Sequence, residues 1–221
     1  DQLILVVQKE GTAADAVWKN IELPVHPFIR LRIHPNFERA DLHTFLLDWA
    51  EQRAKLAVER VDPDLRVSLY AETDHSIPGQ GQSCLAFGME LIRHSLMMRI
   101  KLDKPPPTPS FPPGISIRTV DLAQDARAVF QVDYEAFQDH FGYVAEDPKV
   151  GLERFLHHMT GESSFDPSLW FVAEEKGKLV GICLCRSRGY NEADAGHISS
   201  LGVRRPWRRR GIGLGLLQTA F

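Results

Sequence analysis

Prolines concentrated in one short segment divide this chain of 221 residues into two parts. Residues 104–114 (KPPPTPSFPPG) contain six of the fourteen prolines. Proline fixes φ at about −65° and has no backbone N–H, so this segment suits neither a helix nor a central strand. We predict a semi-rigid linker there, between a first domain at 1–103 and a second at 115–221. A long loop inside one domain is the alternative, but structureless loops of this length are uncommon.

Composition excludes several classes of function. A net charge of −3 gives no global basic field for nucleic-acid binding. Three cysteines, an odd number, argue against a disulfide framework and suit a reducing compartment. The chain has neither an apolar run long enough to span a bilayer nor a recognisable signal peptide. We therefore expect a cytoplasmic protein with neither a membrane nor a nucleic-acid partner. Because it starts at Asp1 and stops at Phe221 inside an apolar pattern, we expect a fragment cut at both ends.

The second domain alternates predicted strands and helices, as a mixed α/β fold does. Residues 115–118 alternate apolar and polar side chains like a strand, and Asp121 is placed to cap the next helix. The further elements expected are a short helix over 153–159, a hairpin of strands over 170–173 and 179–185, a strand over 196–203, and a helix from about residue 211.

The first domain repeats part of this pattern. Its expected elements are a strand over 28–33, a helix from about residue 42, and strands over 66–70 and 91–102. Residues 33–43 (IHPNFERADLH) and 203–213 (VRRPWRRRGIG) share a strand end, a turn with proline, an aromatic residue and an apolar helix. We interpret them as two tandem copies, both truncated. Two unrelated strand–turn–helix units are the alternative.

The turn at 208–213 has the composition of an anion site. The start of a helix presents backbone N–H groups without helical partners and carries partial positive charge. Gly211 and Gly213 have no side chain to keep an anion from those groups, and three arginines at 208–210 add fixed charge. No Lys-Ser/Thr follows the glycines as in a P-loop, and the GxGxxG spacing is absent.

In this context the motif resembles the acetyl-CoA-binding motif of the GNAT superfamily of acyltransferases. Arg208, Gly211 and Gly213 match its Arg-x-x-Gly-x-Gly, after a strand that ends at Val203 and the pair Pro206-Trp207. The order of elements from 115 to 221 is similar to the front of that fold. Two copies joined by a proline linker resemble the tandem GNAT proteins of the mycothiol synthase type.

The resemblance implies a GNAT-like mixed α/β fold and transfer of an acetyl group from acetyl-CoA to a primary amine of a small molecule or peptide. It implies that Leu201, Gly202 and Val203 pair their backbone with the pantetheine arm of CoA. It further implies that the CoA pyrophosphate lies on the turn of Arg208, Arg209, Arg210, Gly211, Ile212, Gly213 and Leu214.

The catalytic base departs from the family pattern. A strand period of two places His197, Ser199, Leu201 and Val203 on one face. Many relatives carry a carboxylate six or four positions before the equivalent of Val203, where this chain has His197 and Ser199. His197 is our candidate base, since histidine titrates near neutral pH. Carboxylates of the preceding loop, Glu192 and Asp194, are the alternatives, and the usual tyrosine acid would fall beyond Phe221.

The corresponding turn of the first copy lacks the motif. Asp41 and His43 occupy its glycine positions and Glu38 that of Arg208, so we expect this copy to have lost CoA binding. Cys183 and Cys185 lack the further ligands a metal site needs, and no metal is expected. Two other functions stay open: a CoA-binding pseudoenzyme, and a phosphate- or nucleic-acid-binding module that uses the arginines of 204–210.

Overall fold

The computed structural model describes residues 2–10, 28–37, 39–58, 68–75, 77–141, 143, 145, 147–161, 164–189 and 194–221. The chain divides into two compact units, Asp1–Lys101 and Leu102–Phe221. None of the described helices is long and apolar enough to cross a lipid bilayer.

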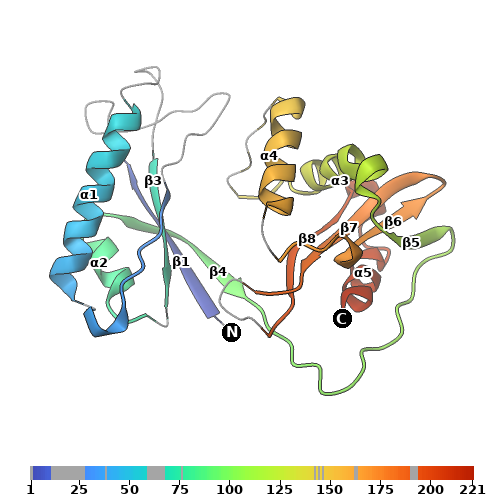
Figure 1. Cartoon of the computed structure of the whole chain (residues 1–221), viewed down its shortest axis with the longest axis horizontal. Coiled ribbons are helices and arrows are strands. Elements are labelled where there is room, and N and C mark those ends of the chain that lie inside the picture. Colours follow the sequence, from blue (N-terminus) through green and yellow to red (C-terminus); the bar gives the residue numbers. More distant parts are fainter. Residues whose placement is uncertain are drawn as a thin grey trace. The chain divides into compact units, whose positions relative to one another are not determined.

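The second unit is built on a four-stranded antiparallel sheet with the order β5-β6-β7-β8 (Figure 1). Its strands are β5 (Ile115–Thr119), β6 (Trp170–Glu175), β7 (Lys178–Arg186) and β8 (His197–Val203). In β7 every residue from 179 to 186 is buried. A strand that is buried on both faces of its sheet has a nearly continuous run of apolar residues, and β7 is such a strand.

Helices cover the two faces of this sheet. α3 (Leu122–Ala136) and α4 (Pro148–Thr160) lie on one face, where Val129, Val132 and Met159 form a cluster with Trp170 of β6. α5 (Ile212–Ala220) lies on the other, where Ile212 and Leu216 pack against Val180 and Cys183 of β7. We call these the α3/α4 face and the α5 face.

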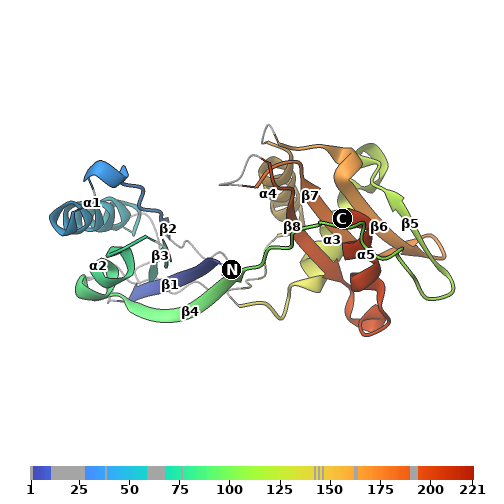
Figure 2. The same cartoon turned by 90° about the horizontal axis from the view of Figure 1, so that it is seen from below.

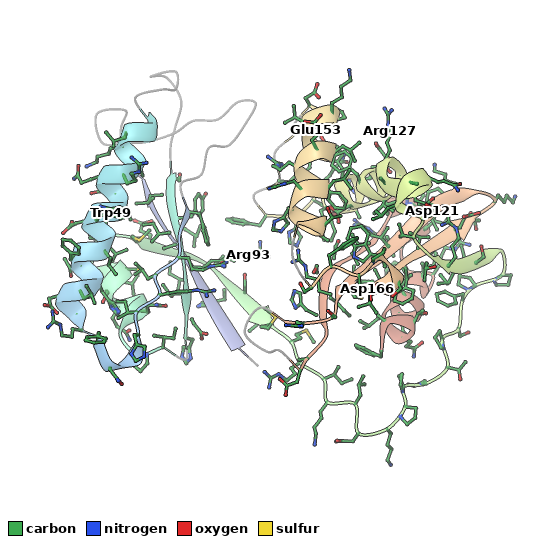
Figure 3. All side chains as sticks on the ribbon, in the orientation of Figure 1. Trp49, Arg93, Asp121, Arg127, Glu153 and Asp166 are labelled. Atoms are coloured by element: carbon green, nitrogen blue, oxygen red, sulfur yellow. The ribbon has the colours of Figure 1, made fainter. Side chains whose placement is uncertain are left out.

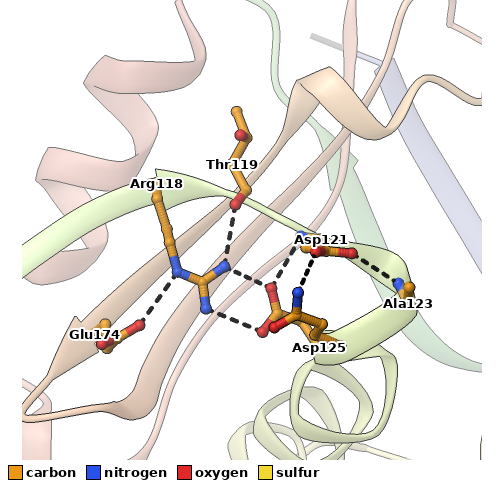
Figure 4. Close-up of polar contacts among 7 residues, drawn as sticks. Arg118, Thr119, Asp121, Ala123, Asp125 and Glu174 are labelled. Carbon is orange, nitrogen blue, oxygen red and sulfur yellow. Dashed lines mark hydrogen bonds and ion pairs between the residues drawn. The ribbon is translucent and has the colours of Figure 1, made fainter.

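A polar network around Arg118 joins β5 to the start of α3 (Figure 4). Its guanidinium donates to Asp125 at 3.0 Å through Nη2 and to Glu174 at 3.2 Å through Nε. The hydrogen bond from Arg118 holds the pKa of Asp125 below its ordinary value, so both groups stay charged. Asp121 caps α3, as predicted, by accepting a hydrogen bond from the backbone N–H of Ala123 at 3.0 Å.

The first unit has its own sheet with the order β2-β3-β1-β4, in which β2 and β3 are parallel and the other pairs antiparallel. The strands are β1 (Gln2–Glu10), β2 (Phe28–Ile29), β3 (Ser68–Asp74) and β4 (Glu90–Met97). α1 (Ala40–Val58) and α2 (Gln80–Ala86) pack on one face through Leu47, Leu69 and Cys84 (Figures 1 and 2). Trp49 of α1 is 61% exposed (Figure 3).

Three predicted ranges change. The strand predicted over 28–33 shrinks to β2, because its pairing is limited to Tyr70 and Ala71 of β3. The strand predicted over 91–102 ends at Met97, which pairs with Gln2, the first residue of β1. The helix predicted over 153–159 starts earlier, since Asp147 caps it and Pro148 opens it. Neither α2 nor β1 was predicted, whereas the remaining helices and strands are confirmed with small shifts of their ends.

Residues 98–114, all described, form no helix or strand. The segment is nevertheless fixed at one point, because Phe111 packs on α5. A Cβ added to Gly215 would lie 2.3 Å from the Phe111 ring, so the missing side chain at Gly215 makes room for that ring.

Candidate functional site

The chain reverses direction between β8 and α5 in a tight turn. A 3-10 turn at Arg205–Trp207 follows β8, and Arg209 and Gly211 then adopt left-handed backbones with φ of 63° and 86°. Gly211 is the N-cap of α5, and its carbonyl accepts the hydrogen bond from the Gly215 N–H at 3.0 Å. The N–H groups of residues 212–214 precede this first helical hydrogen bond. Such groups have no partner within the helix, so they can donate hydrogen bonds to a ligand.

Arg208 holds the turn in place. Its guanidinium donates to the carbonyl of Val203 at 3.0 Å and to that of Ala136 at 2.7 Å. It also pairs with the Asp139 carboxylate at 2.9 Å, and this contact lowers the Asp139 pKa to about 2. The motif arginine thus connects the end of β8, the end of α3 and the turn, and its charge is directed at the protein rather than at a ligand.

Glu175 fixes the other side of the turn. Its carboxylate accepts hydrogen bonds from Trp207 Nε1 at 2.7 Å and from Arg210 at 3.0 Å. These two contacts hold the pKa of Glu175 below its ordinary value. The Lys178 ammonium lies 5.0 Å from the centre of the Trp207 ring, in a cation–π arrangement.

Four of the five arginines between 204 and 210 face carboxylates of the same unit. Arg204 pairs with Glu135 at 3.3 Å, Arg205 and Arg208 with Asp139, and Arg210 with Glu175. Within the described part of the chain, Arg209 is the member of this cluster that has no carboxylate partner. The cluster is therefore largely neutralised, and one cation stays available beside the start of α5.

The glycines around the turn have different reasons to be glycine. A Cβ on Gly211 would contact no neighbouring atom, but this residue has a left-handed φ that disfavours residues other than glycine. A Cβ on Gly213 would make an ordinary contact with Val203 at 3.7 Å, so the fold does not demand glycine there. A Cβ on Gly202 of β8 would lie 2.9 Å from the Cβ of Ala136, so this glycine permits α3 to approach the strand.

A β-bulge interrupts β8 at Ser199. Ser200 pairs with Leu184 and Ile198 with Cys185, so Ser199 is an extra residue opposite β7. The predicted common face of His197, Ser199, Leu201 and Val203 is consequently wrong. Leu201 and Val203 pack on the α5 face. His197 lies opposite Arg186 and, like Ser200, belongs to the α3/α4 face, because the extra residue reverses the alternation of sides.

His197 lies half-buried beside a buried cation. Arg186 is 3% exposed, and its guanidinium donates to Ser199 Oγ at 3.0 Å and to the carbonyl of His158 at 3.4 Å. Burial and the charge of Arg186 both lower the pKa of His197, which favours the neutral imidazole at neutral pH. Asp194 is exposed, and Glu192 lies outside the described residues.

Sequence reasoning missed Asp133 of α3. Its carboxylate accepts a hydrogen bond from Ser200 Oγ at 2.5 Å, next to the bulge. Asp133 lies four residues after Val129 and three before Ala136, both of which are buried, so it occupies the inward stripe of the helix. A carboxylate in an apolar helical stripe was the available signal. Burial raises the pKa of Asp133.

The turn of the first unit that is predicted to correspond to the turn before α5 carries other residues. Residues 35–37 form a 3-10 turn ahead of α1, Arg39 pairs with Asp41 at 2.9 Å, and Glu38 lies outside the described residues. His43 is 2% exposed, with Nδ1 2.9 Å from the hydroxyl of Ser83 in α2. In the predicted pairing of the two turns, this buried histidine stands at the position of Gly213.

The second unit is similar to known acetyltransferases. Residues 127–221 match the family model described as acetyltransferase (GNAT) family. The solved GCN5-related N-acetyltransferase from Sphaerobacter thermophilus is 31% identical, with a TM-score of 0.64 over 88% of this chain and 58% of that one.

Relatives named mycothiol acetyltransferase are also similar. The protein of Thermobispora bispora is 32% identical over 68% of this chain and 50% of its own length. That of Acidothermus cellulolyticus is 30% identical over 86% of this chain and 56% of its own length. The chain thus spans about half the length of these relatives.

Proposed function

We propose that residues 127–221 form an acetyltransferase domain of the GNAT family and that the protein moves an acetyl group from acetyl-CoA to a primary amine of a small molecule or peptide. The turn that opens α5 carries this proposal. It combines a left-handed Gly211, a Gly213 that the fold itself does not require, and Arg209 beside the first N–H groups of the helix. Such N–H groups bind phosphate well.

Acetyl-CoA fits this arrangement as a co-substrate. In the proposal, the N–H groups at 212–214 and the Arg209 guanidinium bind its pyrophosphate, while Arg208 and Arg210 hold the turn in shape through Asp139 and Glu175. Leu201, Gly202 and Val203 pair their backbone with the pantetheine arm. The thioester end then extends past Leu201 toward the bulge at Ser199 and Ser200.

His197 is proposed as the general base. It accepts a proton from the acceptor's ammonium group, and the free amine attacks the thioester carbonyl carbon. The carbon–sulfur bond then breaks, and the nitrogen loses its second proton, which the departing thiolate takes up to become the thiol of CoA. The lowered pKa of His197 supports this role because the neutral base is then the main form at neutral pH. Its place on the α3/α4 face implies that the acceptor arrives from that side.

We also propose that the first unit is a degenerate copy of the same fold and that the protein is cytoplasmic. The copy is supported by the shared order of strand, proline-containing 3-10 turn and helix, which is β2, residues 35–37 and α1 in one unit and β8, residues 205–207 and α5 in the other. The cytoplasmic location is supported by free thiols at all three cysteines.

The test is a calorimetric titration of the full-length protein with CoA and acetyl-CoA, followed by a thiol-release assay on a panel of primary amines. One CoA site per chain and amine-dependent thiol release are expected. Binding without turnover on the panel would instead indicate a CoA-binding pseudoenzyme, and two equivalent sites would refute a degenerate first copy. The absence of CoA binding would overturn the proposal. Nucleic-acid binding is disfavoured because four of the five arginines already face carboxylates.

A further inference from the structure

Asp133 differs from the other acidic residues that surround the site. Glu135, Asp139 and Glu175 each contact an arginine of the 204–210 cluster. The side chain of Asp133 contacts the hydroxyl of Ser200, and among the described residues it has no lysine, arginine or histidine in ion-pair contact. Burial raises its pKa, because the charged form has lost water without gaining a counter-ion.

The position of Asp133 connects it to the reacting group. Ser200 lies directly after the bulge residue of β8 and points to the α3/α4 face, where its hydroxyl reaches Asp133. In the proposed function the thioester lies beside this bulge. The Asp133 carboxylate is therefore hydrogen-bonded to Ser200, the residue beside which the acceptor must meet the thioester. It also lies on the same face as His197.

We propose that Asp133 binds the ammonium group of the acceptor amine and so selects amines that are protonated before they react. This inference rests on the proposed acetyl transfer. A cation entering the α3/α4 face meets the Arg186 guanidinium beside His197, which repels it. A carboxylate on the same face offsets that repulsion and fixes the nitrogen near the bulge.

The two side chains have separate roles in this arrangement. The Asp133 carboxylate holds the R–NH3+ group by a charge-assisted hydrogen bond, while His197 removes one proton to give R–NH2 and an imidazolium. The nitrogen then attacks the carbonyl carbon as described above. Asp133 is thus a specificity-determining residue rather than the base.

The experiment compares Asp133→Asn with Glu153→Gln in the full-length protein. Glu153 is an exposed residue of α4 (Figure 3), so its substitution removes the same charge at a distance from the bulge. Each protein is assayed with an alkylamine, protonated at neutral pH, and with an aniline, which is neutral. The Kd for acetyl-CoA is measured separately by calorimetry.

For Asp133→Asn we expect the KM for the alkylamine to rise about tenfold to a hundredfold, the size of a lost hydrogen bond to a charged group. The KM for the aniline and the Kd for acetyl-CoA should change less than about twofold, and Glu153→Gln should match the wild type throughout. A purely structural role would affect both amines equally.

Equal losses for the two amines, or none for the alkylamine, would overturn the inference while leaving the acetyl transfer intact. If Asp133→Asn does not fold, the wild type decides, since a lower KM for the aniline than for the alkylamine would equally refute it. A wild type that binds acetyl-CoA but acetylates neither amine would remove the proposed function on which the inference rests.

Discussion

Arg208 and Asp139 form a two-pronged ion pair, with Nη1 2.9 Å from Oδ2 and Nη2 3.4 Å from Oδ1. Asp139 comes three residues after the end of α3, and Arg208 stands at the turn before α5. The pair therefore ties the proposed CoA turn to the helix that carries Asp133. In the proposed function, binding of the cofactor arm and placement of the acceptor therefore share one structural support.

The first prediction concerns this pair and pH. The pKa of Asp139 falls from an ordinary value of 3.8 to about 2 in the folded protein. A depressed folded pKa means that the stabilisation is complete above the unfolded value and is lost as pH falls from about 4 through about 2. Asp139→Asn should lower the melting temperature at pH 6, with the gap closing between pH 4 and 2. Thermal unfolding followed by circular dichroism measures this.

A constant gap across that range would show that Asp139 acts through shape and not through its charge. Asp166→Asn is a useful comparison, because the Asp166 pKa is also lowered but by the hydroxyl and N–H of Ser168 rather than by an arginine. Both variants should show closing gaps, while Asp139→Asn alone should weaken CoA binding.

The second prediction separates two glycines of α5. Gly215→Ala would place a Cβ 2.3 Å from the Phe111 ring, and overpacking of this kind costs about 1–3 kcal/mol. Gly213→Ala meets Val203 at 3.7 Å, and replacing a helical glycine adds up to about 1 kcal/mol of stability. The new methyl group should nevertheless weaken CoA binding about tenfold by crowding the N–H groups at the helix start. Urea unfolding and calorimetry measure the two effects.

A matched double variant checks the cause. Phe111→Ala should remove most of the penalty of Gly215→Ala, because the three atoms nearest to the added Cβ all belong to the Phe111 ring. Additive losses would mean that Gly215 is needed for some other reason.

The sequence was informative where a residue's role is local. Asp121 as a helix cap and the glycines at the start of α5 depend on neighbours in the chain, and the structure confirms these features. The faces of β8 depend on a bulge that no local pattern reveals, so strict alternation assigned His197 to the wrong side. Two partners of Arg208, Asp139 and Ala136, lie 69 and 72 residues away in the sequence, so local reasoning could not find these contacts.

The third prediction uses Arg209, the arginine of the cluster without a carboxylate partner among the described residues. Arg209→Ala should weaken CoA binding about tenfold and reduce the dependence of its Kd on salt, while the free energy of unfolding changes by less than about 0.5 kcal/mol. Binding of acetyl-pantetheine, which lacks the pyrophosphate, should be unaffected. Titration calorimetry at several salt concentrations measures the binding of CoA and of acetyl-pantetheine, and urea unfolding measures the stability.

Arg210→Ala is the control for Arg209→Ala. It removes the same charge but also leaves Glu175 with Trp207 as its remaining contact at the turn, so it should lower stability as well as affinity. Equal affinity for CoA in the wild type and Arg209→Ala would exclude a contact between Arg209 and the pyrophosphate.

The last prediction concerns His197 as the base. His197→Gln should lower kcat about a hundredfold or more, the usual contribution of a general base, with little change in the Kd for acetyl-CoA. In the wild type, kcat/KM should fall on the acid side with a midpoint below about 6.5, because burial and Arg186 lower the pKa of His197. The variant should lose this limb of the pH profile when the same amine is used.

The stability of the protein gives an independent readout for His197. Because the pKa of His197 is depressed in the folded protein, its contribution to stability is complete above about pH 6.5 and declines as pH falls through the folded pKa. His197→Gln should flatten that decline. An unchanged acid limb in His197→Gln, together with the flattened stability profile, would assign the proton transfer to another group and leave His197 a structural residue of the bulge.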